Sequence, residues 1–517
     1  MISIHQLLGL ALGFVLATSL AMAAPAEPRT AFTPGELWPD NNGVPINAHG
    51  GGILLHDKTY YWFGEHKIAG GAGNAAHVGV HVYSSKDLYN WTDRGIALKV
   101  SEDPTSEITE GCVIERPKVI YNRKTHKFVM WFHLELKGQG YSAARAAVAV
   151  ADQAEGPYQY QGSFRPNAGV WPRGVTEKDK DPAGDLAKHF SGGQMARDMN
   201  LFVDDDGTAY QLYSSENNGT MDLSRLSDDY LKPAGDFARI WPFHWREAPA
   251  MFKHKGKYYL ITSGTSGWAP NRANTLVASS IWGPYTSLGD PSLGPPEHTK
   301  TAFESQSTYV LPVPGNKDAF IYMGDRWRPE NAIDGRYVWL PLVFVQDKPR
   351  ILWRDAWSLN DIHVTPEDTK YLTSMERAGA SVKFVDSADP GNPGEAAIDG
   401  DPKTLWHTAW DASAPNFPHT IVIQFPSART MTGITVLPRQ DDSPNGRIKD
   451  YAVYVSKDNK HWGAPVAQGA FDDTRALTTV AFATPQNARF VKFVARTSFD
   501  NTKPFASVAE IEILFQK

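Results

Sequence analysis

The chain has 517 residues, more than the ~250–300 that one hydrophobic core supports, so at least two domains are expected. Hydrophobic residues make up 42% and charged residues 21%, which excludes a largely disordered, collagen-like or multi-span membrane chain. The formal net charge is -6 and no basic run stands out, which gives no electrostatic support for a nucleic-acid or anionic-membrane partner. A single cysteine, Cys112, excludes an intrachain disulfide and a thiolate metal cluster.

The N-terminus has the pattern of an export signal. The apolar stretch from Leu7 to Leu20 is too short to span a bilayer, and Ala21-Met22-Ala23 offers a small-x-small cleavage site. We therefore expect residues 1–24 to be a signal peptide that leaves a periplasmic or secreted protein, with no membrane attachment after cleavage. An uncleaved anchor is the alternative, because the residues ahead of the apolar stretch include His5 but no Lys or Arg.

Five segments share a strand-turn-strand layout. They are 49–54 with 59–63, 115–121 with 127–132, 197–203 with 209–213, 247–252 with 257–261, and 306–311 with 318–322. Asp206-Gly207, Lys255-Gly256 and Pro314-Gly315 supply turn residues that tight hairpins require. Such units cannot bury a face alone but can when arranged radially. The predicted fold class is therefore all-β, with a five-bladed β-propeller over residues 25–370.

The residues that open the first strand of each unit are polar. If these strands are innermost, their leading ends meet around the axis and form a ring of His49, Glu115, Asp198, Glu247 and Gln306. Gathering such groups in one funnel is costly unless they serve a function. For any one of them, capping a strand end and binding structural water is the alternative.

The segment from Arg197 to Tyr210, followed by 247–252, resembles the blade motifs of glycoside hydrolase family 43. This resemblance implies a five-bladed propeller that acts as an inverting exo-glycosidase and needs no catalytic cofactor. Family members use an aspartate base in blade one, a second aspartate that tunes the acid, and a glutamate acid. Asp198 matches the tuning aspartate and Glu247 the acid, but the first blade reads Asn47-Ala48-His49-Gly50 and has no carboxylate.

Four motifs resemble the exo-β-1,3-galactanase branch of that family, in which a glutamine takes the place of the base. They are Ala48-His49-Gly50, Trp62-Phe63-Gly64-Glu65, Glu115-Arg116-Pro117-Lys118 and Thr265-Ser266-Gly267-Trp268. Gln306 is the matching glutamine, and the resemblance covers residues of roughly 35–360. It implies release of galactose from β-1,3-galactan, the backbone of arabinogalactan, with inversion.

Inverting hydrolysis needs an acid on the leaving oxygen and a group that positions water on the opposite face. We predict Glu247 as the acid, with its pKa raised by Asp198 and partial burial, and Gln306 as the residue that holds the water. Glu115 either assists the water or binds a sugar hydroxyl. The predicted substrate contacts are Glu65, Arg116, Asn217, Thr265 and Trp268. Trp268 and Trp327 follow strand ends, where each either stacks on galactose or packs.

The hairpin pattern disappears between Thr365 and Val385, which predicts a linker at 371–386 and a second domain at 387–517. Alternating strands separated by turns favour a β-sandwich, a jelly roll. Residues 396–408 and 509–513 resemble a discoidin or coagulation factor type C module of the carbohydrate-binding family 32 kind. His407, Arg439 and Asn445 are its predicted sugar contacts. Asp399, Asp401 and Thr404 offer hard oxygen ligands, and the resemblance adds Glu510 for a structural Ca²⁺. A hydrogen-bonded turn without metal is the alternative.

Two other functions stay open. An α-L-arabinofuranosidase or β-xylosidase of the same family would be expected to have the first-blade aspartate that is missing here. A non-catalytic galactan-binding propeller would not need the acid at Glu247. We expect a monomer whose partner is a polysaccharide or oligosaccharide.

Overall fold

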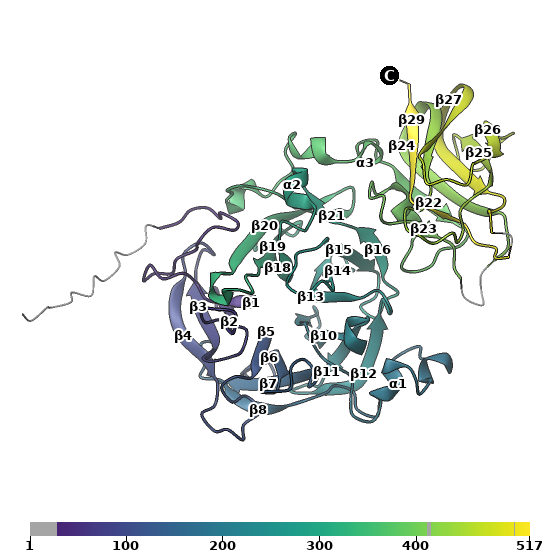
Figure 1. The fold of residues 1–517 in the computed structure, drawn as a ribbon. Helices are drawn as coiled ribbons and strands as arrows, with labels where there is room; N and C mark the ends of the chain where they lie inside the picture. Colours follow the sequence, from purple (N-terminus) through teal and green to yellow (C-terminus); the bar gives the residue numbers. More distant parts are fainter. Residues whose placement is uncertain (1–27, 411–414, 501, 517) are drawn as a thin grey trace, which may run out of the picture.

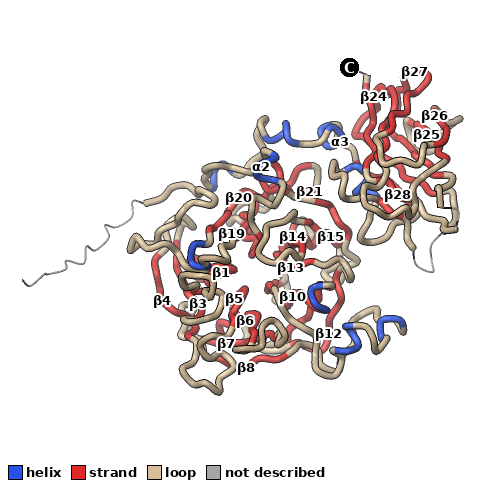
Figure 2. The backbone as a smooth tube through the Cα atoms, viewed as in Figure 1, coloured by secondary structure: helices blue, strands red, loops and turns tan. Residues whose placement is uncertain are grey.

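The computed structural model describes residues 28–410, 415–500 and 502–516, and the predicted signal peptide lies outside these residues. Strands dominate the described chain, as predicted (Figure 1, Figure 2). The helical pieces are short: α1 (Asp185–Lys188), α2 (Pro296–Thr299), α3 (Ser374–Arg377), η1 (Lys178–Lys180), η2 (Glu216–Asn218), η3 (Ala332–Asp334), η4 (Leu359–Asp361), η5 (Asp368–Tyr371) and η6 (Gly394–Ile398). Among the described residues, no helix has the length and apolar character needed to cross a membrane.

Residues 49–352 form five antiparallel sheets that follow one another along the chain and surround a common centre (Figure 1). The first is β1 (His49–His56), β2 (Thr59–His66), β3 (Gly79–Ser85) and β4 (Thr92–Lys99). The second is β5 (Val113–Asn122), β6 (Lys127–Glu135), β7 (Arg145–Ala151) and β8 (Gln159–Phe164). The third is β9 (Met199–Val203), β10 (Ala209–Ser215), β11 (Thr220–Leu226) and β12 (Pro233–Ile240).

The fourth sheet is β13 (Arg246–His254), β14 (Lys257–Gly264), β15 (Asn274–Ala278) and β16 (Thr286–Gly289). The fifth is β18 (Gln306–Pro312), β19 (Ala319–Arg326), β20 (Arg336–Val345) and β21 (Lys348–Leu352), with the short β17 (Ser292–Leu293) added in parallel to β21. The first long strand of each sheet contacts its counterpart in the next sheet, and β18 returns to β1. These five strands therefore close a ring.

Apolar side chains fill the space between neighbouring sheets. Phe63 of the first sheet packs with Met130 and Phe132 of the second, and similar clusters lie between the following pairs. The fifth sheet returns to the first through Trp62 and Trp339, whose ring centroids are 4.8 Å apart. Each buried large apolar side chain contributes about 1.5–3 kcal/mol, which stabilises a ring that no sheet could form alone.

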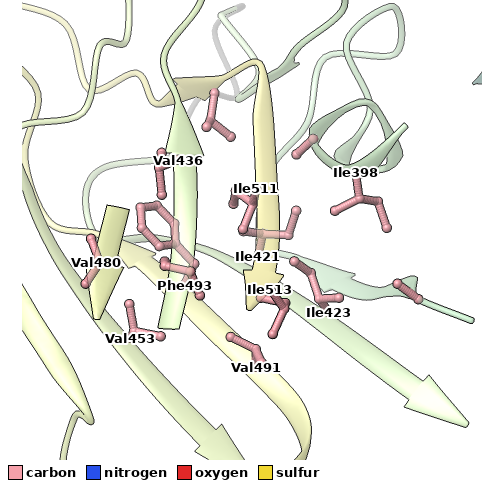
Figure 3. Close-up of a cluster of buried hydrophobic side chains, with 14 of the residues drawn as sticks. Ile398, Ile421, Ile423, Val436, Val453, Val480, Val491, Phe493, Ile511 and Ile513 are labelled. Atoms are coloured by element: carbon pink, nitrogen blue, oxygen red, sulfur yellow. The ribbon is translucent and has the colours of Figure 1, made fainter. Parts of the chain in front are cut away.

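The C-terminal part is also sheet-rich. Its main sheet consists of β22 (Ser381–Val385), β24 (His419–Leu437), β25 (Asp450–Ser456), β26 (Ala467–Ala470), β27 (Thr478–Ala495) and β29 (Glu510–Phe515). A two-stranded sheet pairs β23 (Trp406–His407) with β28 (Ser507–Val508). Ile421, Ile423, Phe493 and Ile511 lie in one buried apolar core (Figure 3).

The predicted linker at 371–386 needs correction at its second half. β22 falls inside it, yet this strand pairs with β24 through contacts such as Ser381 with Gln424. The C-terminal sheet therefore begins before residue 387. The two parts of the chain also touch through charged groups: Arg350 pairs with Glu376, and Arg272 pairs with Asp401.

Candidate active site

A cavity of about 250 Å³ opens at the centre of the ring of sheets. Its lining combines carboxylates, amides, cations and aromatic rings: Glu65, Asn74, Glu115, Arg116, His133, Tyr141, Arg197, Asp198, Asn218, Glu247, Gly267, Trp268, Gln306 and Trp327. Four of the five residues of the predicted ring thus meet in one cavity. The fifth, His49, is fully buried outside this lining and stacks on Tyr337 with ring centroids 5.4 Å apart.

A repeated local distortion aims the two central glutamates. In Glu115-Arg116-Pro117 and Glu247-Ala248-Pro249 the middle residue has a left-handed backbone, with φ 56° and 54°. The strand pairing shifts register directly after each glutamate. A bulge of this kind redirects the preceding side chain, and a proline without N–H fits where the ladder is interrupted. The Glu-x-Pro sequence therefore explains why both carboxyl groups face the cavity.

Glu247 has the environment of a protonated acid. Burial, together with the neighbouring Asp198 carboxylate, raises the pKa of Glu247 to about 8, although Arg116 acts in the opposite direction. Asn218 Nδ2 donates to Oε2 of Glu247 at 3.3 Å. Glu247 is thus protonated for the most part at neutral pH, the state that a general acid requires.

Gln306 uses every hydrogen-bonding position of its side chain. Nε2 donates to Oε1 of Glu247 and to Oγ of Ser263, both at 2.9 Å. Oε1 accepts from Trp327 Nε1 at 2.9 Å and from Arg116. Because tryptophan and arginine can only donate, the orientation of the amide is fixed.

Arg116 connects the anionic groups of the cavity. Its guanidinium donates to Oδ2 of Asp198 at 2.9 Å, and its backbone N–H donates to Oε1 of Glu65 at 2.8 Å. Asp198 also accepts from the backbone N–H of Ala248 at 3.1 Å, which joins it to the distorted segment after Glu247. Asp198 is therefore held where its charge acts on Glu247.

Glu115 is kept ionised by its neighbours. Burial would raise its pKa, but the hydrogen bond and charge of His133, at 2.9 Å, hold the pKa of Glu115 well below its usual range. Tyr141 donates to Glu115 at 2.6 Å, and Asn74 donates at 3.0 Å. Burial alone would lower the pKa of His133, but Glu115 and Glu135 raise it to about 9. Glu115 is therefore an anion paired with a cation.

Most of the predicted contact residues lie in this cavity, and two do not. Glu65, Arg116 and Trp268 line it, whereas Asn217 and Thr265 are absent from the lining. The Asn217 side chain points to Asp185, to which its Nδ2 donates at 3.2 Å, because η2 turns with a left-handed residue at this position. Its neighbour Asn218 reaches Glu247 instead.

The two tryptophans differ in their roles. Trp327 holds Gln306, and the Arg116 guanidinium lies 5.3 Å from its ring centroid, so it packs within the site. Trp268 packs edge-on against Trp327 but remains 40% exposed at the cavity wall.

Sequence reasoning missed His133, Tyr141, Asn74 and Arg197 as lining residues. His133 could not be found by continuing the hairpin register from its turn, because the pairing shifts by one residue between Lys118 and Glu115, and this shift is what brings His133 opposite Glu115. Tyr141 and Asn74 come from loops between strands, for which strand periodicity gives no register.

A second cavity, of about 630 Å³, lies in the C-terminal part and contains all three predicted sugar contacts. His407, Arg439 and Asn445 line it together with Asn392, Leu405, Trp410, Asp441, Lys503 and Phe505. Two hydrogen bonds from Arg439 to Asp441, at 2.6 and 2.7 Å, hold the guanidinium in place. Trp410 is 51% exposed and lies edge-on to His407, which offers an aromatic face to a ligand.

The predicted Ca²⁺ ligands are only partly together. The Thr404 hydroxyl lies within hydrogen-bond distance of both carboxylate oxygens of Asp399. Burial, together with the charge of Asp401, raises the pKa of Asp399 to about 6, and burial together with the Asp399 carboxylate raises the pKa of Glu510 to about 9. Oε1 of Glu510 is buried without a hydrogen-bond partner. Two crowded, half-buried carboxylates of this kind fit a cation. Asp401, in contrast, pairs its carboxylate with Arg272 from the loop after β14.

A half-buried carboxylic acid beside a second carboxylate, in a cavity with sugar-sized volume and aromatic walls, is the arrangement of a glycoside hydrolase. Residues 49–323, which are 275 of the 517 residues, match the model for glycosyl hydrolases family 43. The chain belongs to this family. Residues 380–511 match the F5/8 type C domain.

Solved structures of the same family are similar over long stretches. A family 43 β-1,3-galactosidase with galactodeoxynojirimycin is 47% identical with a TM-score of 0.61, and the match covers 63% of this chain and 100% of that one. An exo-β-1,3-galactanase of Phanerochaete chrysosporium with β-1,3-galactotriose is 27% identical with a TM-score of 0.55, over 94% of this chain and 100% of that one.

Two curated proteins match over shorter stretches. Galactose oxidase of Gibberella zeae is 40% identical over 129 residues, 25% of this chain and 19% of that protein. Sialidase of Micromonospora viridifaciens is 35% identical over 147 residues, 28% of this chain and 22% of that protein. The chain thus spans about a fifth of the length of these curated relatives.

Proposed function

We propose that this protein is an exo-acting glycoside hydrolase that releases galactose from β-1,3-galactan with inversion. The observation that carries the proposal is the contact between a protonated Glu247 and the amide of Gln306, in a cavity that also holds Asp198. The solved relatives named as β-1,3-galactosidase and exo-β-1,3-galactanase support the substrate class. The five sheets are the blades of a five-bladed propeller in this proposal.

Each central residue has a role that follows from its contacts. Glu247 donates its proton to the leaving glycosidic oxygen, and the charge of Asp198 keeps that proton available. Arg116 limits the mutual repulsion of the carboxylates by pairing with Asp198. Glu65 and Trp268 contribute a hydrogen-bond acceptor and an apolar face to the sugar.

The hydrolytic water is assigned to Gln306 with the assistance of Glu115. Oε1 of Gln306 already accepts from Arg116 and Trp327, so a water that it holds must take the place of one of these donors. Glu115 is an ionised acceptor in the same cavity. Its low pKa makes it a weak base, and it orients the water or a hydroxyl rather than removing a proton at equilibrium.

The C-terminal module binds galactan through the cavity around His407, Arg439 and Asn445, and it spans about 380–517 in this proposal. Asp399, Thr404 and Glu510 would hold a structural Ca²⁺, which cancels the repulsion between the two carboxylates. The propeller occupies 25–370 of a monomer. We also propose export through the signal peptide at 1–24, into the periplasm or the medium.

The product of the first turnover tests the reaction and its stereochemistry. We expect the protein to release galactose from β-1,3-galactobiose and from β-1,3-galactan, with α-galactose visible first by NMR. Arabinoxylan and p-nitrophenyl arabinofuranoside are the controls and should give no product. Activity on these controls alone would replace the assignment by an arabinofuranosidase or xylosidase, and initial β-galactose would require a covalent nucleophile.

A further inference from the structure

The connection between β12 and β13 is an exposed aromatic segment that the mechanism does not use. It reads Trp241-Pro242-Phe243-His244-Trp245 and is called the aromatic loop below. The Phe243 side chain is 68% exposed and that of Trp245 is 54% exposed. Neighbouring exposed aromatic rings of this size are characteristic of binding surfaces.

The backbone of the aromatic loop is strained at alternate residues. Trp241, Phe243 and Trp245 have φ of 54°, 66° and 52°, in the left-handed region that bulky residues avoid. Backbone strain of this kind collects at functional sites. Three strained aromatic residues in five positions therefore call for a functional explanation.

Both ends of the aromatic loop are anchored. Trp241 Nε1 donates to the carbonyl of Pro390 in the C-terminal module at 3.4 Å, and its ring stacks on His244 with centroids 4.3 Å apart. At the other end the backbone N–H of Trp245 donates to the Gly219 carbonyl at 3.4 Å. Gly219 follows Asn218, which binds Glu247.

The exposed ring of Phe243 is also supported from beneath. The Arg239 guanidinium lies 5.1 Å from its centroid, and Glu216 holds that guanidinium through two hydrogen bonds of 2.7 and 2.8 Å. The third partner of Arg239 is Asp179, at 2.9 Å. Arg239 is thus paired with two carboxylates, and the Phe243 ring itself presents an uncharged, apolar face.

The aromatic loop joins the edges of the two cavities. Four residue steps separate Trp241 from Trp245, and a chain spans at most about 14 Å over that length. One end lies next to Asn218 of the catalytic cavity, and the other contacts Pro390, two residues before Asn392 of the module cavity. An extended oligosaccharide that leaves the catalytic cavity can follow this path.

We propose that Trp245 and Phe243 form a binding platform for the leaving-group side of the galactan chain, beyond the units held in the catalytic cavity. The C–H face of a galactosyl unit stacks on each ring, while its hydroxyl groups remain in water. An uncharged sugar polymer matches the uncharged aromatic rings, and continuity with the cavity of Glu247 identifies the occupant. The platform rests on the proposed function.

Chain-length dependence tests the platform. We would measure kcat and KM of the full-length protein on β-1,3-galactobiose and β-1,3-galactopentaose for the wild type, Trp245→Ala, Phe243→Ala and the double variant. The double variant should lose about tenfold in kcat/KM on the pentaose through a higher KM, the amount that about 1.4 kcal/mol of stacking represents. Galactobiose should change less than about twofold, because it does not extend onto the platform.

Two control variants accompany the series. Trp245→Phe keeps a ring and should retain most of the preference for the pentaose. Phe384→Ala removes an aromatic side chain that is 52% exposed on β22, and it should leave kcat/KM on both substrates unchanged.

Three results would overturn the platform. The first is an unchanged ratio of kcat/KM on the pentaose to kcat/KM on galactobiose in the double variant. The second is an equal loss of kcat/KM on both substrates. The third is a wild type that is a dimer and a double variant that is a monomer, with no change in that ratio. A wild type that hydrolyses neither substrate refutes the proposed function, and the platform with it. An active wild type with an unchanged ratio refutes the platform alone.

Discussion

Nε2 of Gln306 donates a hydrogen bond of 2.9 Å to Oε1 of Glu247. The residue that we propose in the place of the usual base is thus a direct neighbour of the proposed acid. A carboxylate at 306 would place an oxygen, rather than an N–H, against Glu247. This contact makes the amide chemically distinct from the carboxylate that other members of the family are expected to use.

Gln306→Glu is therefore expected to lower activity at neutral pH, because a further negative charge would repel Glu247 and disturb the bonds from Arg116 and Trp327. Gln306→Ala should be worse, since it removes the amide altogether. Initial rates on β-1,3-galactobiose should therefore decrease in the order wild type, Gln306→Glu, Gln306→Ala. If Gln306→Ala retains full activity while Glu115→Gln is inactive, the water belongs to Glu115 alone.

Glu247→Gln removes the transferable proton and should reduce kcat on β-1,3-galactobiose by about 10²–10⁴-fold, the contribution that general acids make. Glu330→Gln is the matched control, because that side chain is exposed and lies outside the lining. Substrate binding by the Glu247 variant should persist by calorimetry. Near-wild-type turnover would remove Glu247 from the role of acid.

The pH profile should follow the ionisation of Glu247. Its pKa is raised to about 8, so the acid is protonated below that value, and kcat/KM should fall as the pH rises through it. Asp198→Asn removes a charge that raises this pKa, and the alkaline limb should move to lower pH. The shift is measured from kcat/KM between pH 5 and 10. An alkaline limb that stays at the same pH in Asp198→Asn would show that burial alone raises the pKa of Glu247.

Much of the fold was accessible from the sequence because its units are local. The hairpin at 247–261 can be predicted from its two apolar strands, which flank the turn residues Lys255-Gly256. Glu247 then lies at the start of the first strand, at the end that faces the cavity. The placement of residues in the cavity was predictable where they lie on a strand or directly before one, as for Glu115, Gln306 and Asp198. It was not predictable where loops decide, because the direction of Asn217 depends on a left-handed turn in η2.

The contacts of the aromatic loop and the ion pair between Arg272 and Asp401 could not be predicted from the sequence either. Both depend on how the C-terminal module lies against the ring of five sheets, and no periodicity within either part of the sequence carries that information. Asp401 therefore looked like a metal ligand in its turn, although its carboxylate faces Arg272.

Ala248 offers a test of the distorted segment after Glu247. Its φ is 54°, so Ala248→Val places a β-branched side chain in the left-handed region and should cost about 1–3 kcal/mol of stability with a loss of kcat. Ala248→Gly is the matched control and should keep both, because glycine accepts this conformation and retains the N–H that binds Asp198. Denaturant unfolding and initial rates measure the two effects. Equal behaviour of both variants would contradict a role for the backbone in aiming Glu247.

Calcium should stabilise the full-length protein through Asp399 and Glu510. A ligand that binds only the folded state adds about 2.7 kcal/mol at a concentration 100 times its Kd, so EDTA should lower Tm and CaCl₂ should restore it. Glu510→Gln should abolish this response. It should also be at least as stable as the wild type in EDTA, because it removes the carboxyl group whose pKa is raised by burial and by the charge of Asp399. The order of the two Tm values thus reverses with calcium, which mere damage to the fold would not produce.

Glu512→Gln, on the same strand but bound to Ser374, should keep the calcium response. A wild-type Tm that ignores both EDTA and calcium would mean that Asp399 and Glu510 share a proton instead of a metal ion.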